Sequence, residues 1–417
     1  MGSSCVVTGT EQVSASVQVL ERRSGGVRLL QLDALRGLAA ASVVLHHSRL
    51  AFQVAPTPWY LVPFVFGDSA VVLFFVLSGY VLSLPYWNGT RLPYVPYAVR
   101  RFCRVYLPYA AALLLALVGA WWFQGSPLRL TPWFNQTWHS PISWPLVTSQ
   151  LKMRPTPELN TAFWSLRYEV EMSLAMPLLC LFLRKGNAVW ITLLGAAAMC
   201  SVPVLPTALQ AHYLDRTVAV AVLFAMGATL AKSPESVRRF VQGAGHWIWL
   251  FLAISLLCFW QYSTRWENLV SPQIQAHFDP FQRHRTELLS GLGALGLLAC
   301  ALHVRSFARL LTHPMLEYLG RISFSLYLVH GTVLFAALFL LSGRVPLPFL
   351  IGTVVVMSFA AAHLFCVGIE EPTIRFGKQL SRWIAGLDAN PVSSQRSFQQ
   401  AGSYPHMPDQ KPLEEAA

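Results

Sequence analysis

Ionisable side chains interrupt several long apolar stretches of this 417-residue sequence. The first stretch reads LDALRGLAAASVVLHHSRL and holds Arg36 and His47, eleven residues apart. In a helix this spacing is three turns, so both side chains lie on one face, about 16 Å apart along the axis. An arginine can hold an anionic group and an imidazole can move a proton, so the pattern predicts acid–base chemistry. The alternative is a structural histidine bonded to a neighbouring helix.

A second apolar stretch, YLGRISFSLYLVHG, repeats the theme with Arg321 and His330. Their spacing places His330 about 13 Å deeper than Arg321, which predicts a depth similar to that of His47. Ser323, Tyr327 and His330 recur at i, i+4 and i+7 and therefore share one helix face. An interhelical hydrogen-bond seam explains this face as well as a functional site does.

The stretch FWSLRYEVEMSL carries two glutamates at the predicted outer end of a helix. Arg167 can pair with Glu171 at i+4, which leaves Glu169 to face the interior of a bundle. There Glu169 could orient an imidazole or an acceptor hydroxyl, or it could serve in structural pairing alone.

A basic group occurs in YAVRRFCRVYLP, where Arg101 and Arg104 are i, i+3 neighbours with Arg100 beside them. Guanidinium groups match phosphate oxygens, so three arginines within five residues predict a phosphate clamp. Charges that hold an inner loop at the membrane surface are the alternative.

The region 124–160 is rich in tryptophan and proline and includes Trp133, Trp138, His139 and Trp144. Anchoring at the membrane interface is one interpretation of these tryptophans. A platform on which saccharide rings stack, at the outer mouth of the protein, is the other.

The elements that must position these residues are membrane helices. Only 12% of the residues are charged and 54% are hydrophobic, whereas soluble domains are about a quarter charged. Stretches near the ~20 apolar residues that a spanning helix needs predict an all-α bundle of about ten transmembrane helices: 34–54, 67–86, 106–123, 162–183, 187–205, 213–231, 246–263, 286–304, 316–340 and 346–368.

Charge and cysteine distributions exclude other classes of protein. The net charge of +12 is scattered between apolar runs, which disfavours nucleic-acid binding. None of the seven cysteines shows CxxC or Cys/His metal spacing, so we expect no metal site.

Alternate loops are richer in Lys and Arg, which predicts that both termini are cytoplasmic.

The ends of the chain differ from its apolar middle in composition. We expect a disordered cytoplasmic leader over 1–28, a membrane domain over 29–385 and a disordered cytoplasmic tail over 386–417. The expected location is the inner cell membrane, which the chain crosses several times.

Together these motifs resemble membrane-bound acyltransferase family 3, the polysaccharide and peptidoglycan O-acyltransferases. The most specific mark is Arg36 and His47 with ten residues between them. The other marks follow in the order of the family: LFFVLSGY (73–80), the RxxR pair Arg101 and Arg104, WSLRYEVE (164–171), LGRISFSLYLVH (319–330) and IEEPTIR (369–375).

The resemblance implies transfer of an acyl group, usually acetyl, from cytoplasmic acyl-CoA to a hydroxyl of an extracytoplasmic glycan or related acceptor. It implies that Arg36 and His47 are the catalytic pair and that Arg101 and Arg104 bind CoA phosphates. Acetyl-CoA is then a donor substrate, and no permanently bound cofactor is expected.

The resemblance extends to two further residues, because Glu169 and His330 match the family's motifs in the fourth and ninth predicted spans. His47 could act as a general base or as a nucleophile that carries the acyl group. A secondary transporter or flippase of lipid-linked saccharides is the rival interpretation, with the same residues along a translocation path. The sequence leaves open the acceptor, the acyl length and the oligomeric state.

Overall fold

The computed structural model describes residues 20–23, 26–52, 64–90, 93–154, 156–201, 212–264 and 272–386. These residues are predominantly helical, which confirms the expected helical class. Strands β1 (Leu20–Arg23) and β2 (Gly26–Leu29) pair antiparallel just before the first helix. They lie at the end of the range expected to be a disordered leader. The rest of that leader and the tail after residue 386 lie almost entirely outside the described residues.

The helical elements follow one another along the chain. Their bounds are α1 Leu30–Phe52, α2 Gly67–Trp87, α3 Tyr94–Phe123, η2 Phe134–Gln136, α4 Trp144–Leu151, α5 Trp164–Lys185, α6 Ala188–Ser201, α7 His212–Lys232, α8 Pro234–Gly243, α9 Trp247–Thr264, α10 Pro272–His303, α11 Arg305–Leu311, α12 Pro314–Leu341, α13 Leu347–Phe365, the π-helical turn η5 Cys366–Glu370, and α14 Glu371–Ile384.

Several of these helices are suited to a bilayer. Five are long and apolar enough to cross a membrane, and the number rises to seven if each of two bent pairs, α5 with α6 and α7 with α8, counts as one span. The expected ten spans, and the orientation with both termini inside, stay predictions. Helix α1 is outside this set because Asp33, Arg36 and the two histidines interrupt its apolar sequence.

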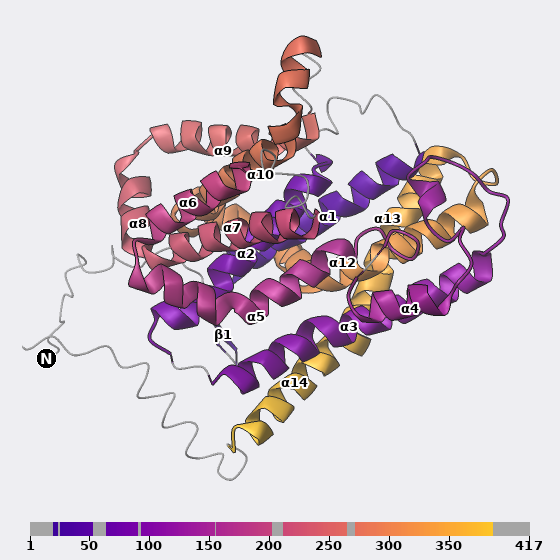
Figure 1. The fold of residues 1–417 in the computed structure, drawn as a ribbon, viewed down its shortest axis with the longest axis horizontal. Coiled ribbons are helices and arrows are strands. Elements are labelled where there is room, and N and C mark those ends of the chain that lie inside the picture. Colours follow the sequence, from indigo (N-terminus) through magenta and orange to yellow (C-terminus); the bar gives the residue numbers. More distant parts are fainter. Residues whose placement is uncertain are drawn as a thin grey trace, which may run out of the picture.

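Helix α1 lies between α2 and α12 in the middle of the bundle, as Figure 1 shows. It runs parallel to α12, since Gly37 lies against Gly320 and His47, further along α1, is bonded to His330. The start of α2 lies against the second half of α1, where Ser42 accepts a hydrogen bond from the backbone of Phe66. Gly37 lets α1 approach α12 closely: a Cβ built there would lie 2.6 Å from the backbone nitrogen of Gly320. This approach sets the spacing of the residues that face each other on the two helices.

Helices α2 and α7 form a second close pair. A Cβ at Gly79 would lie 2.1 Å from the carbonyl oxygen of Phe224. Small residues allow membrane helices to approach this closely.

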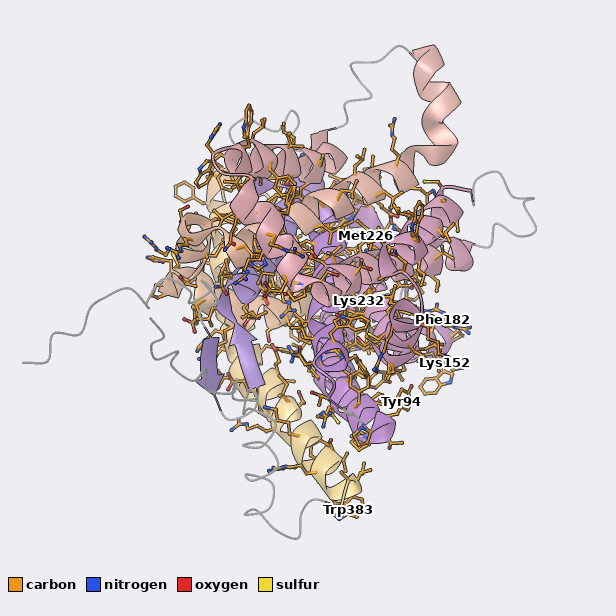
Figure 2. The ribbon with its side chains drawn as sticks, turned by 90° about the vertical axis from the view of Figure 1, so that its left-hand side faces the viewer. Tyr94, Lys152, Phe182, Met226, Lys232 and Trp383 are labelled. Carbon is orange, nitrogen blue, oxygen red and sulfur yellow. The ribbon has the colours of Figure 1, made fainter. Side chains whose placement is uncertain are left out.

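The C-terminal helix α14 packs along α3 on one side of the molecule (Figure 1). Figure 2 shows Trp383 at its far tip, beyond the body of the bundle, where the side chain is exposed. An apolar tryptophan on an outlying, partly basic helix is typical of a helix at a membrane interface.

Candidate functional site

Two imidazoles meet where α1 packs on α12. The Nδ1 atom of His47 is 2.9 Å from Nε2 of His330, and the two rings are stacked with their centroids 5.1 Å apart. The other ring nitrogen of His330, Nδ1, is 3.0 Å from the carbonyl oxygen of Leu326. His330 is fully buried, whereas His47 is half-buried. The two histidines, expected at similar depth, are therefore in direct contact.

The hydrogen bonds define which nitrogen carries each proton. A carbonyl oxygen can only accept, so Nδ1 of His330 donates to Leu326. In the neutral ring Nε2 of His330 is then an acceptor, and His47 donates to it from Nδ1. Burial favours the neutral ring, because a buried cation needs a partner and no carboxylate among the described residues bonds to either imidazole. Of the four ring nitrogens, Nε2 of His47 is the one that takes part in neither hydrogen bond, so its lone pair is available.

The loop between α3 and α5 covers this dyad of His47 and His330. The ring of Trp133 lies 5.1 Å from that of His47. Trp138 is buried and donates from Nε1 to the carbonyl oxygen of Leu159, so it is part of the core. Trp144 is exposed at the start of α4. Of the tryptophans in this region that the sequence singled out, Trp133 is the one against the dyad.

A second group of charges surrounds Arg101 on α3. Its Nη2 atom donates to Oε1 of Glu169 and to Oγ of Ser173, at 3.0 and 2.8 Å. Ser78 on α2 donates to the same Glu169 oxygen at 3.0 Å. Both partners of the ion pair are largely buried, with side-chain exposures of 14% for Arg101 and 18% for Glu169. Within the described part of the chain, Nε of Arg101 has no hydrogen-bond partner.

Three further residues complete this basic cluster. Arg36 forms an ion pair with Asp33 one turn before it, at 3.3 Å. Arg104 is exposed, and it interacts electrostatically with Arg36 and with Glu370. Glu370 is buried in the π-helical turn η5, where it accepts a hydrogen bond from Ser325 at 2.5 Å. Such turns often occur at functional sites.

The predicted site residues therefore fall into two groups. His47 and His330 form the dyad, and Arg36, Arg101, Arg104 and Glu169 belong to the basic cluster. For Glu169 two roles were predicted, orienting an imidazole or acceptor hydroxyl, or structural pairing alone. In the structure it pairs with Arg101 and accepts from Ser78, and no hydrogen bond joins it to either histidine of the dyad.

One residue of the cluster was missed, and one pairing was correctly predicted. Glu370 lies in the IEEPTIR motif, where two adjacent acids beside an apolar stretch were the available signal. The predicted i+4 pair of Arg167 and Glu171 is confirmed at 2.9 Å. Among the described residues no group of three or more His, Cys, Asp or Glu is arranged to hold a metal ion.

Comparison with known proteins agrees with the motifs. Residues 29–365 match the acyltransferase 3 family, which is described as an acyltransferase domain. The chain belongs to the acyltransferase 3 family. As a family member with several apolar helices it is a membrane protein, and the family supports an acyltransferase activity.

The chain is also similar to "Protein 2 in picA locus" of Rhizobium radiobacter, with 38% identity over 92 residues. The match covers 21% of this acyltransferase 3 chain and 44% of that relative, so it spans less than half the length of the curated protein. No solved structure matches the chain significantly.

Proposed function

We propose that this protein is a membrane O-acyltransferase. It moves an acyl group, in our proposal acetyl, from cytoplasmic acyl-CoA to a hydroxyl of an extracytoplasmic glycan or related acceptor. The observation that carries the proposal is the dyad. His330 is fixed by Leu326 and in turn orients His47, which leaves Nε2 of His47 as an available base. This base–orienter arrangement is the one that activates hydroxyl groups in acyl transfer.

The basic cluster supports an anionic donor. Arg36, Arg101 and Arg104 provide guanidinium groups, and Arg104 is exposed to incoming ligand. Guanidinium forks match the phosphate oxygens that CoA carries at one end. Since Arg36 is about 16 Å from His47 along α1, phosphates held at the cluster would leave the long thioester arm of the donor directed towards the dyad.

Two alternative reaction routes are consistent with this geometry. As a general base, Nε2 of His47 takes the proton of the acceptor hydroxyl while the oxygen attacks the thioester carbonyl. The carbon–sulfur bond then breaks, and the proton passes from His47 to the CoA thiolate. As a nucleophile, Nε2 first attacks the thioester carbonyl, and the carbon–sulfur bond breaks to release the CoA thiolate. The acceptor hydroxyl then displaces His47 from the acyl carbon, and its proton passes to the thiolate. Both routes yield an ester and free CoA.

The test follows labelled acetyl groups in membranes that contain the protein. We expect wild-type membranes to consume labelled acetyl-CoA and to label glycan, and His47→Ala membranes to do neither at equal protein levels. His246→Ala removes an exposed histidine in the turn just before α9 and serves as the matched control. Retained transfer by His47→Ala would refute the assignment. Movement of an unmodified saccharide without any dependence on CoA would identify a transporter instead.

A further inference from the structure

The half-buried ring of Trp133, in the loop between α3 and α5, lies against the imidazole of His47. The ring centres are 5.1 Å apart and the planes are inclined by 33°, which is closer to offset stacking than to edge-to-face contact. The same indole stacks on Phe335 of α12, with the ring centres 5.4 Å apart. Helix α12 therefore supports the indole through Phe335 and orients the imidazole through His330.

The turn that carries Trp133 is itself anchored in the protein. Phe134, which begins η2, is fully buried. Its backbone N–H donates to the side-chain oxygen of Thr131 at 3.0 Å. The side-chain oxygen of Asn135 accepts a hydrogen bond from the backbone of Leu130 at 3.1 Å. The position of the indole is thus set by its own turn as well as by α12.

The proposed reaction places a positive charge on the ring of His47. Nδ1 already carries a proton and donates to His330, so a proton or an acyl group gained at Nε2 produces a cationic ring. In hydrolases a carboxylate stabilises such an imidazolium. Among the described residues, those that act electrostatically on His47 are His330 and His46, and an imidazole carries no negative charge. A buried cation is costly without a partner, so another group must stabilise it.

We propose that Trp133 is a positioning residue whose π system stabilises the positively charged state of His47. The ring separation of 5.1 Å lies within the ~6 Å over which an aromatic ring attracts a cation, and indole is the strongest aromatic side chain in this role. The attraction is stronger for the cation than for the neutral ring, so it lowers the barrier instead of only tightening the ground state. This inference rests on the proposed function, because the reaction creates the charge.

The first arm of the test measures initial-rate acetyl transfer in membranes while the concentration of labelled acetyl-CoA is varied. Trp133→Leu should lower kcat about tenfold and Trp133→Phe about threefold, because a benzene ring attracts a cation less strongly than indole does. The KM for acetyl-CoA should stay unchanged, since the donor phosphates are proposed to bind at the basic cluster. Trp190→Leu removes an exposed tryptophan of α6 and should keep the wild-type kcat.

Other outcomes of this arm would overturn the inference. Equal losses of kcat in Trp133→Leu and Trp133→Phe would show that the indole only fills space. Rates that return to the wild-type value when more of the membrane glycan is added would assign the indole to binding of the acceptor. Wild-type kinetics in Trp133→Leu would show that the contact with His47 is not used.

The second arm needs no acyl transfer and follows the melting of the full-length protein in detergent. An attraction between Trp133 and the cationic ring of His47 stabilises the folded protein at low pH and is lost as the ring becomes neutral. Trp133→Leu should therefore lower the melting temperature by about 2 °C more at about pH 5.5 than at about pH 8. In the His47→Ala background the effect of Trp133→Leu should be the same at both pH values, and this double-mutant comparison isolates the contact.

The two arms separate this inference from the proposed function. If wild-type membranes transfer no acetyl group but the pH-dependent coupling of Trp133 and His47 is present, the inference stands and the proposed function fails. If acetyl transfer occurs but the coupling is equal at both pH values, the inference fails and the proposed function stands.

Discussion

At the residue scale the central feature is a histidine whose proton position is set by a second histidine. His330 is fully buried, and Leu326 accepts from its Nδ1, so the orientation of His47 depends on a chain of two hydrogen bonds. In hydrolases a buried acid has the orienting position, and loss of the correct tautomer there is very costly to the rate. Here an imidazole held by a backbone carbonyl takes that position.

The first prediction concerns this orienting role. His330→Ala removes the acceptor for Nδ1 of His47, so the tautomer and the ring angle are no longer fixed. We expect kcat to fall about 10²–10⁴-fold, the range of general acid–base catalysis, with the KM for acetyl-CoA nearly unchanged. The measurement is initial-rate acetyl transfer in membranes. A fall in donor affinity with unchanged kcat would show that His330 does not act through His47.

The second prediction concerns the buried ion pair of Arg101 and Glu169. Glu169→Gln leaves a largely buried guanidinium without its charge partner, which costs about 3–5 kcal/mol of stability. We expect a lower melting temperature in detergent and altered affinity for acetyl-CoA. Glu235→Gln breaks the exposed pair with Arg238 and should cost at most about 1 kcal/mol. Equal melting temperatures of the two variants would contradict the structural importance of Glu169.

At the element scale, close helix approach explains how the two groups of residues are positioned. Gly37 brings α1 against α12, which places His47 beside His330. Gly79 brings α2 against α7, and the neighbouring Ser78 bonds to Glu169 on α5. Lipid provides no hydrophobic drive between helices, so such van der Waals contact and polar bonds hold the bundle together.

The third prediction tests this packing. Gly79→Ala places a Cβ within 2.1 Å of the Phe224 carbonyl oxygen, so α2 and α7 must move apart. We expect lower thermal stability, measured by fluorescence-detected size exclusion after heating, together with lower activity. Gly352→Ala on α13 is the matched control, because a Cβ there meets nothing within 4 Å. If both variants are equally stable, the close contact of α2 and α7 is not required.

At the scale of the whole molecule, the dyad and the basic cluster are separated along the bundle. The dyad lies towards the C-terminal end of α1, while Arg36 lies near its start. A donor and an acceptor that approach from opposite sides of a membrane would meet in such an arrangement.

The fourth prediction fixes the orientation of this arrangement. We start from a variant without its native cysteines and introduce one at Ser140 or at Ser306, both exposed. A membrane-impermeant maleimide should label Ser140→Cys in right-side-out vesicles and Ser306→Cys in inside-out vesicles. The opposite pattern would overturn the expected topology, and the assignment of donor and acceptor sides with it.

The sequence alone determined those features that depend on local backbone geometry. The low charge content indicated a membrane protein, and helical periodicity placed Arg36 and His47 on one face and paired Arg167 with Glu171. These inferences need only 3.6 residues per turn, which is the same in every helix.

Only the tertiary structure decided which distant residues meet. His47 and His330 are 283 positions apart, and their contact depends on the rotation and register of α1 against α12. The same holds for Glu169, which bonds to Arg101, and for Glu370, which joins the cluster through the turn before α14. Rotation and register follow from many small contacts between helices that no local pattern encodes. The sequence therefore named the chemical groups, and helix packing determined their partners.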